Sequence, residues 1–310
     1  MGALFYSIWH RPYVFVFLLA FLAFSWMEQG KLRTGIWLVT GYLVALTAEW
    51  CSVNPAIRIP FGYYVYHDDV LANDLAIFGV PFFDSLSFAF LSYVSFSFAQ
   101  FFMSPLWRRG FDYQRVTSRG IRNSPVTLLL GAALMMVIDI IVDPVAHLGR
   151  HWFLGDIYHY PSPGYHFDVT MANYAGWFVV GWVIIFINQR VDAFLANREL
   201  ASGRELKLPY VPAKGLFAPL FWAGILLFNL GVTAWLGWAY DPGDLEFDAA
   251  EVRKLFLAGC FVVGPILLLA AIQLLKPANR PSYEDVTAWL ADYPNPKLKA
   301  RIRPDSGNPS

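Results

Sequence analysis

The sequence predicts an all-α, polytopic membrane helix bundle with about seven transmembrane helices, and three observations support this prediction. Of the 310 residues, 57% are hydrophobic and 15% are charged, whereas about 25% of an ordinary soluble domain is charged. Apolar runs long enough to cross a bilayer, which takes about 20 residues, recur along the chain. The loops between these runs are alternately basic and acidic, as in chains that cross a membrane repeatedly.

The apolar runs define the expected elements in order. The predicted spans are residues 12–27, 35–53, 78–103, 125–148, 169–188, 215–240 and 253–275. The first is the shortest and resembles a signal-peptide core, but it has no small-x-small cleavage site, so we expect a retained anchor. We expect a transmembrane helical domain over residues 1–276 and a cytoplasmic basic tail over 277–310, partly disordered, with a short amphipathic segment near 284–293.

The charge of the loops orients these spans. Basic residues gather in residues 28–34, 104–124 and 189–214 and after Lys276, and the intervening loops are acidic. By the positive-inside rule, the C-terminus is cytoplasmic and the N-terminus outside, in a multi-pass protein of the cell membrane. The net charge of +0 argues against a nucleic-acid partner. Of the two cysteines, Cys51 and Cys260, free thiols are favoured over a disulfide.

Two carboxylates, Asp139 and Asp143, interrupt the apolar run 125–148. A charge inside a bilayer costs at least about 2.5–3.5 kcal/mol. Residues four apart lie on the same face of a helix. Such a pair is rarely kept for stability alone, so the spacing indicates a site.

Polar residues of other spans lie at a similar depth. At 1.5 Å per residue, Glu49 and Asp84 fall about 6 to 9 Å from the outer ends of their spans, level with Asp139, and Asn173 lies about four residues into its span. Intramembrane ionisable groups normally face a cavity or one another. The sequence therefore predicts a buried polar pocket that opens toward the outer leaflet, with no counterpart in the cytoplasmic half.

Structural roles stay open for each of these residues. Asp143 precedes Pro144 and is a candidate N-cap for a new short helix. Asp84 is a candidate cap at the start of its own span. Glu49 is a candidate partner for backbone groups in the irregular stretch that follows it. Asn173 is a candidate for an interhelical hydrogen bond.

All six histidines fall on the predicted outer side. Asp143, His147 and His151 recur at spacing four, which on a continuous helix forms a stripe of metal ligands. Pro144 interrupts that stripe, and the sequence has no HExxH or second HxxxH box. Solvated interfacial histidines are therefore favoured, and no metal is predicted.

Aromatic residues are dense in the same zone. They are Tyr63, Tyr64, Tyr66, Phe82, Phe83, Trp152, Phe153, Tyr158, Tyr160, Tyr165, Tyr174 and Trp177. Part of this set is the usual aromatic belt of a membrane protein. Aromatic faces also stabilise a cation, by about 0.5–2 kcal/mol each. A pocket of acids lined with aromatics suits chemistry that protonates an alkene and shelters the carbocation; we include Asp84 and Trp152 among its candidate substrate-binding residues.

The motifs resemble those of a known family. The stretch from Glu49 through PFGYYVYHDD (60–69) to GVPFF (79–83) resembles one hallmark block of a membrane carotenoid-biosynthesis family. MVIDIIVDPVAHLGRHWF (136–153), followed by NYAGW (173–177), resembles the second. The family includes the carotenoid 1,2-hydratases that act on γ-carotene and on bisanhydrobacterioruberin. The resemblance covers residues 40–190, and the order of these motifs is more specific than any one of them.

This resemblance implies an integral membrane enzyme that hydrates the terminal 1,2 double bond of a linear (ψ-end) carotenoid to a tertiary alcohol. Hydration is redox-neutral, so no cofactor is implied. The implied site residues are Glu49, Asp139, Asp143 and Asn173, with Tyr64, Tyr66 and Trp177 as pocket lining. The chain departs from the family where DSLSF (84–88) stands in place of a tryptophan, and in the loop 156–168. The exact carotenoid therefore stays open.

The working hypothesis is general acid catalysis by the Asp139/Asp143 pair. One carboxylic acid protonates the alkene, and water placed by Glu49 or Asn173 adds to the cation. Which acid donates the proton stays open. Docking of other carotenoid-pathway enzymes on the arginine-rich cytoplasmic loops is a further possibility, beside contact with membrane lipid.

Two other functions fit parts of the sequence. One is a membrane protein that binds a carotenoid or lipid in the same pocket without turnover. The other is a Mg²⁺-dependent prenyltransferase, suggested by DxxxD and by the acidic stretch HDDVLAND (67–74). Such sites also need cations for the diphosphate, and the nearby basic residues are Arg58 and Arg150. The prenyltransferase is therefore the less favoured alternative.

Overall fold

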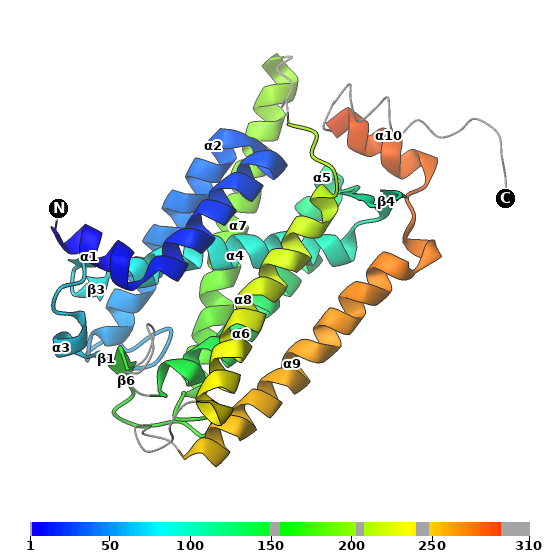
Figure 1. Ribbon diagram of the computed structural model, residues 1–310. Helices are drawn as coiled ribbons and strands as arrows, with labels where there is room; N and C mark the ends of the chain where they lie inside the picture. Colours follow the sequence, from blue (N-terminus) through cyan, green and yellow to red (C-terminus); the bar gives the residue numbers. More distant parts are fainter. Residues whose placement is uncertain (1, 149–155, 203–207, 240–247, 293–310) are drawn as a thin grey trace.

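Long helices form most of the computed structural model, which describes residues 2–148, 156–202, 208–239 and 248–292 (Figure 1). Among these residues, six helices are long and apolar enough to cross a membrane. They are α2 (Pro12–Val53), α4 (Phe82–Met103), α6 (Pro125–Ala146), α7 (Met171–Ser202), α8 (Phe217–Trp238) and α9 (Ala249–Leu275). The protein is an all-α, multi-pass membrane protein, as predicted. The number of seven crossings and the sides of the termini stay predictions.

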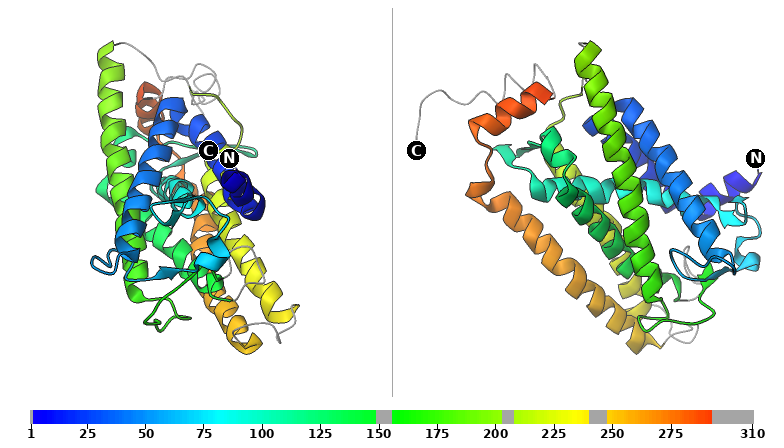
Figure 2. Two further views of the ribbon diagram at one scale, coloured as in Figure 1. Left: turned by 90° about the vertical axis from the view of Figure 1, so that its left-hand side faces the viewer. Right: turned by 180° about the vertical axis from the view of Figure 1, so that it is seen from behind.

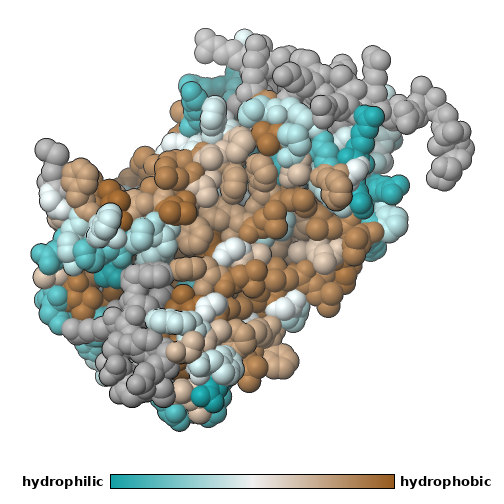
Figure 3. All heavy atoms as spheres, viewed as in Figure 1, coloured by the Kyte–Doolittle hydropathy of each residue, from teal (hydrophilic) through white to brown (hydrophobic). Residues whose placement is uncertain are grey.

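The surface agrees with this assignment. Apolar residues form a broad band across the middle of the molecule, and polar residues gather at its two ends (Figure 3). Helix α9 packs against α8 at the edge of the bundle (Figures 1 and 2). Its side chains Phe261 and Leu268 are exposed, as expected for a face that contacts lipid.

The first long helix, α2, is broken in the middle. At Gly30 the backbone is non-helical, with φ of 82° and ψ of 166°. Tyr13 and Glu49 each line a cavity that contains Asp84, although a straight helix would separate them by about 54 Å. The chain therefore reverses at Gly30, and the two halves lie side by side (Figures 1 and 2). The predicted loop 28–34 is reduced to this sharp turn.

Helix α4 is the centre of the bundle. It is buried along most of its length and packs against α2, α6, α7 and α8. Its close approach to α2 depends on Gly41, where an added Cβ would lie 2.7 Å from the Cα of Ala89. Cys51, near the end of α2, and Cys260, in the middle of α9, are free thiols, as predicted.

The ends of α6 and α7 differ from the predictions. Helix α6 begins after Ser124, whose side chain accepts a hydrogen bond from the Thr127 amide, a favourable N-cap. It continues through Pro144 to Ala146, so the alternative that Asp143 caps a new helix is wrong. Helix α7 continues to Ser202, well beyond the predicted end at residue 188.

Short elements connect the long helices. They are α1 (Gly2–His10), α3 (Asp68–Leu71), α5 (Arg119–Arg122), α10 (Tyr283–Asp292), the 3-10 helices η1 (Lys214–Leu216) and η3 (Pro277–Asn279), and the strands β1 (Val65–Tyr66), β2 (Ala76–Ile77), β3 (Val80–Pro81), β4 (Leu106–Arg109), β5 (Asp112–Arg115) and β6 (Tyr158–His159). The strands form the antiparallel pairs β1–β6, β2–β3 and β4–β5.

The predicted amphipathic segment of the tail is helix α10. Ser282 and Asp285 form a reciprocal cap at its start, with hydrogen bonds of 2.8 and 3.1 Å between side chains and backbone amides. Val286 and Trp289 then pack on Val116, next to the β4–β5 hairpin. This part of the tail is docked on the helical domain, and its cytoplasmic location stays a prediction.

Candidate active site

Four helices bring polar side chains to one point. Asp139 and Asp143 lie one turn apart on α6, and Asn173 lies in the first turn of α7. The Asn173 amide nitrogen donates to Asp139 Oδ2 at 2.7 Å and to Asp143 Oδ2 at 2.5 Å. Both protons of this amide are thereby used. Asn173 therefore forms the predicted interhelical hydrogen bond, and it does so with the two predicted site residues Asp139 and Asp143.

A second carboxyl pair faces the first. Glu49 on α2 accepts a hydrogen bond from Ser85, and Asp84 on α4 accepts one from the Tyr66 hydroxyl at 2.8 Å. The N-cap of α4 is Pro81, so Asp84 is not the cap at the helix start. We call Glu49, Asp84, Asp139 and Asp143 the acid cluster.

A polar cavity of about 300 Å³ joins most of these groups. Its lining residues are Glu49, Phe61, Tyr64, Asp84, Phe88, Asp143, Tyr158, Tyr160, Asn173 and Trp177. No lysine, arginine or histidine belongs to this lining among the residues that the structure describes. Carboxyl groups that are buried without a counter-ion carry a large desolvation cost when ionised. The cavity is therefore suited to holding protons.

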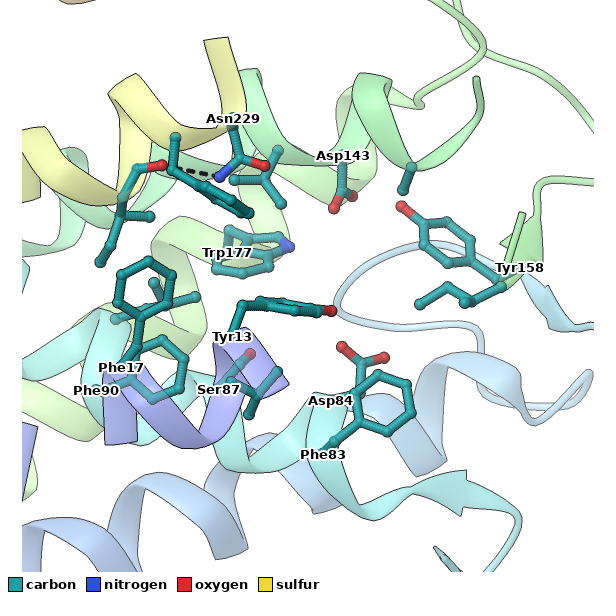
Figure 4. Close-up of a pocket in the computed structure, with 17 residues that line it drawn as sticks. Tyr13, Phe17, Phe83, Asp84, Ser87, Phe90, Asp143, Tyr158, Trp177 and Asn229 are labelled. Carbon is teal, nitrogen blue, oxygen red and sulfur yellow. Dashed lines mark hydrogen bonds between the residues drawn. The ribbon is translucent and has the colours of Figure 1, made fainter. Parts of the chain in front are cut away.

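An apolar cavity of about 680 Å³ adjoins the polar one. Its walls come from α2, α4, α6, α7 and α8 and from Ile157 and Tyr158 at β6, and they are mostly aromatic and aliphatic (Figure 4). The two cavities share Asp84, Asp143, Tyr158 and Trp177. Acid groups thus stand at the boundary between an apolar chamber and a polar one. This arrangement fits a hydrocarbon whose end must meet an acid and water.

Four tyrosines cover the acid cluster, because two short strands pair across it. Strands β1 and β6 are antiparallel with Tyr66 opposite Tyr158. Side chains alternate between the faces of a strand, so Tyr64, Tyr66, Tyr158 and Tyr160 share one face. Their rings lie 5.3 to 6.1 Å apart. We call these four residues the tyrosine cluster.

Burial raises the pKa of each hydroxyl in the tyrosine cluster well above its usual value of 10.0. Nearby carboxylates raise it further: Glu49 acts on Tyr64, Asp84 on Tyr66, and Asp143 on the other two. The hydroxyls stay protonated near neutral pH. They remain hydrogen-bond donors toward the acid cluster.

Two glycines let the β1 strand approach the helices. Gly62 has φ of +81°, a conformation that other residues rarely adopt, and it precedes Tyr63 at the start of the turn into β1. Gly176 on α7 faces Phe61, and an added Cβ would lie 2.9 Å from the Phe61 Cα. The FG and GW parts of the motifs therefore have a packing role. Trp177, next in the chain, stacks on Phe88 with 4.3 Å between ring centroids.

His147 lies behind the tyrosine cluster. It is 8% exposed, and its ring meets those of Tyr158 and Tyr160 at 4.9 and 5.8 Å. Burial lowers its pKa from 6.5 to about 4, so the ring is neutral at pH 7. Its Nε2 has no hydrogen-bond partner among the described residues.

The metal-ligand stripe gains no support. Among the described residues, no group of three or more His, Cys, Asp or Glu is placed to hold a metal ion. His151 and the candidate Trp152 lie outside the described residues. In the acidic stretch 67–74, Asp68 and Asp69 are exposed, and Asp74 accepts from Ser7 Oγ at 2.7 Å. This stretch does not face the Asp139/Asp143 pair, as paired diphosphate sites would.

Sequence reasoning missed several residues of the site. Tyr13 lines the apolar cavity, although its span was expected to be only an anchor. Tyr158 and Tyr160 belong to the predicted aromatic zone but not to the predicted site residues. The repeated Tyr-x-Tyr spacing in 64–66 and 158–160 was a signal for two strands with tyrosines on one face.

The other end of the bundle has a buried polar cluster as well, so the expectation of no counterpart is wrong. Arg33 lies 2.5 Å from Asp192 and 2.8 Å from Glu199. Arg122 lies 3.1 Å from the second oxygen of Asp192, and its Nη2 donates to Gln29 at 2.6 Å. We call Arg33, Arg122, Asp192 and Glu199 the ion network. In this network two arginines pair with two carboxylates.

The comparison with known proteins places the chain in a family. No curated protein and no solved structure matches it. The family model described as "Carotenoid biosynthesis protein" matches residues 10–240, which include the acid cluster, the tyrosine cluster and all residues that line the two cavities. Because this match covers well over half of the chain, the protein belongs to the carotenoid biosynthesis protein family.

Proposed function

We propose that this protein is a carotenoid hydratase that adds water to the terminal 1,2 double bond of a linear carotenoid by acid catalysis. The observation that carries the proposal is the position of Asp84 and Asp143, which line both the apolar and the polar cavity. A hydrocarbon end in the first cavity would meet carboxyl groups and water at the second. Family membership supports a carotenoid as the hydrocarbon.

Asp143 is the proton donor in this proposal. It lines both cavities, whereas Asp139 is 0% exposed and lies behind it. The Asn173 amide holds one oxygen of each carboxyl group. Two neighbouring buried carboxyl groups cannot both ionise without a large cost, so the pair keeps a proton.

The reaction proceeds in two balanced steps. The Asp143 proton is transferred to C-2 of the terminal double bond, whose π electrons form the new C–H bond and leave a tertiary cation at C-1. A water oxygen then bonds to C-1, and the proton it releases passes to a carboxylate of the acid cluster. The proton is therefore returned, and no electrons are gained or lost. General acid–base help of this kind contributes about 10²–10⁴-fold.

The aromatic walls have a defined part in this scheme. Trp177, Phe88 and Phe61 line the polar cavity, and their faces lower the energy of a cation by about 0.5–2 kcal/mol each. The tyrosine cluster limits access of bulk water, which would otherwise solvate the carboxylates, favour their ionisation and remove the proton that the reaction needs.

The test is pigment analysis in a bacterium that accumulates lycopene or γ-carotene. Expression of the wild type should give a product heavier by one or two waters, seen by liquid chromatography and mass spectrometry. Asp143→Asn and Asp139→Asn should abolish it. Asp68→Asn is the matched control, because Asp68 is an exposed carboxylate at the same end that lines neither cavity.

Two results would contradict the proposal. Unchanged pigments in the presence of well-folded protein that co-purifies with carotenoid would indicate binding without turnover. Wild-type product levels from both aspartate variants would show that the acid cluster is not the proton source.

A further inference from the structure

The first half of α2 contributes directly to the apolar cavity. Tyr13, Val14 and Phe17 all line it. Figure 4 shows Asp84 and Asp143 facing each other across the cavity, with the Tyr13 hydroxyl pointing into the gap between them. The Tyr13 ring also forms part of the apolar wall, where it stacks on Phe228 with 6.3 Å between centroids. The hydroxyl thus lies at the boundary of the two cavities, and the ring on the apolar side.

A buried anchor fixes Tyr13 in this place. Pro12 begins α2, and Arg11 before it has a non-helical backbone with φ of −122° and ψ of 48°. Asp74, 8% exposed, accepts a hydrogen bond from Ser7 Oγ at 2.7 Å and lies 3.6 Å from Arg11 Nη2. The Ser7 hydroxyl oxygen in turn accepts from the Leu75 amide at 3.0 Å.

The Arg11 side chain extends this anchor toward the site. Its guanidinium lies 4.9 Å from the centroid of the Phe83 ring, and Phe83 directly precedes Asp84. The last residue of the acidic stretch 67–74 therefore holds the start of α2 in place. Tyr13 lies two residues beyond Arg11, so the anchor fixes the position at which its side chain enters the cavity.

We propose that Tyr13 is a further catalytic residue, whose hydroxyl holds the attacking water between Asp84 and Asp143, and that Asp74 is its positioning residue. This inference rests on the proposed hydration. A water at this point reaches the cation at C-1 and is within reach of a carboxylate that accepts its proton. The hydroxyl donates to the water oxygen or accepts from it, and no covalent bond of Tyr13 changes.

Protonation of the alkene and capture of the cation are two events that a simple activity assay does not distinguish. Protonation of C-2 depends on Asp143, whereas capture of the cation depends on the placed water. A cation that is not captured loses a proton and returns to an alkene. In D₂O such a return leaves deuterium at C-2 of the recovered substrate. The ratio of deuterium exchange to hydration therefore reports on capture of the cation, the step assigned to Tyr13, and not on protonation.

The experiment uses the full-length protein in lipid vesicles that contain lycopene, incubated in D₂O, with alcohol and deuterium content measured by mass spectrometry. For Tyr13→Phe we expect hydration to fall about 10- to 100-fold, the usual effect of losing one hydrogen bond near a charge, while deuterium exchange continues. Asp143→Asn should lose both exchange and hydration.

Tyr42→Phe is the matched control, because Tyr42 lies on the same helix, lines neither cavity, and has a hydroxyl with no hydrogen-bond partner among the described residues. It should behave as the wild type. Asp74→Asn should raise the exchange-to-hydration ratio in the same direction as Tyr13→Phe. The double variant should be no worse than Tyr13→Phe, because both act through one hydroxyl.

Two results would overturn the inference while leaving the hydratase intact. One is wild-type hydration by Tyr13→Phe. The other is an equal loss of exchange and hydration, which would place Tyr13 in the protonation step or in folding. A wild type that neither hydrates nor exchanges would instead overturn the proposed function, and this inference with it.

Discussion

The two ends of the bundle bury charged residues in opposite ways. In the ion network, the carboxylates of Asp192 and Glu199 lie within 3.1 Å of arginine nitrogens. In the acid cluster, four carboxyl groups meet around a cavity whose described lining includes no basic side chain. A matched buried pair recovers much of its desolvation cost, and an unmatched group does not. The difference separates a structural cluster from a site that the fold maintains at a cost.

Neighbouring residues reinforce this contrast. Close to the ion network, Glu28 accepts hydrogen bonds from Tyr93 at 2.5 Å and Ser97 at 2.7 Å, and lies 3.4 Å from Arg115. In the acid cluster the partners are neutral: the Asn173 amide, the Ser85 hydroxyl and the hydroxyl of Tyr66. Neutral donors orient a carboxyl group without fixing its charge. A proton can then be lost and regained during a reaction.

The largest expected effect comes from Asp143→Asn. We expect hydration to fall by about 10²–10⁴-fold, because the proposed proton donor is lost. The free energy of unfolding should stay within about 1 kcal/mol of the wild type, or rise, because a buried acid without a counter-ion is replaced by a neutral amide. Pigment analysis and thermal unfolding in detergent measure the two quantities. A strong loss of stability would remove the contrast with the ion network.

The converse is expected of Arg33→Met in the ion network. Removing this side chain leaves Glu199 without its arginine and Asp192 with only part of its positive partners, at a cost of about 3–5 kcal/mol in the free energy of unfolding. Protein that remains folded should hydrate at the wild-type rate, because the network lies at the far end from the cavity. Activity per folded molecule is the deciding measurement, and a selective loss of turnover would contradict it.

Some residues of the site could be predicted from the sequence, and others could not. The meeting of Glu49, Asp84, Asp139 and Asn173 was predictable, because helical rise fixes depth and a charge in lipid must turn inward. Tyr13 was not predictable as a site residue, because the predicted spans 12–27 and 35–53 place it on the outer side with Glu49 but do not show which helices its side chain meets. The pairing of β1 with β6 sets Tyr66 opposite Tyr158, far apart in the chain, and the Tyr-x-Tyr spacing indicates the two strands but not that they pair with each other.

The ion network was missed for a different reason. Arg33 lies in a segment that the hydropathy pattern interprets as a loop, and Asp192 and Glu199 lie beyond the predicted end of their span. The positive-inside rule treats such residues as solvated charges. The structure extends α7 to Ser202 and reduces the first loop to a turn, which brings these residues together. Charge patterns orient a membrane protein but do not show which charges pair.

His147, at the same end of the bundle as the acid cluster, should make the stability of the protein depend on pH. Its pKa is lowered from 6.5 to about 4 by burial, so the unfolded chain binds this proton first as the pH falls. Stability contributed by the neutral ring is present above pH 6.5 and is lost between pH 6.5 and about 4. The loss amounts to about 3 kcal/mol.

His147→Leu should remove that part of the pH dependence. Melting temperatures of both proteins across this range give the comparison, since carboxylates elsewhere titrate equally in each. Parallel curves for variant and wild type would show that His147 is not buried as a neutral ring. Arg33→Lys is the control in the ion network. Because lysine keeps the positive charge, this variant should show the same pH dependence of the melting temperature as the wild type.

The smallest expected effect belongs to Tyr66→Phe. The Tyr66 hydroxyl donates to Asp84 at 2.8 Å and lies 3.3 Å from the Tyr64 hydroxyl, so its loss removes one neutral donor from the acid cluster. The expected cost is about 1 kcal/mol of stability, with a several-fold fall in hydration. Because a carboxylate is stabilised by such a donor, the pH at which hydration is half-maximal should move upward. An unchanged pH profile would show that this hydroxyl only packs, and would limit the proton-handling region to Asp143, Asp139 and Asn173.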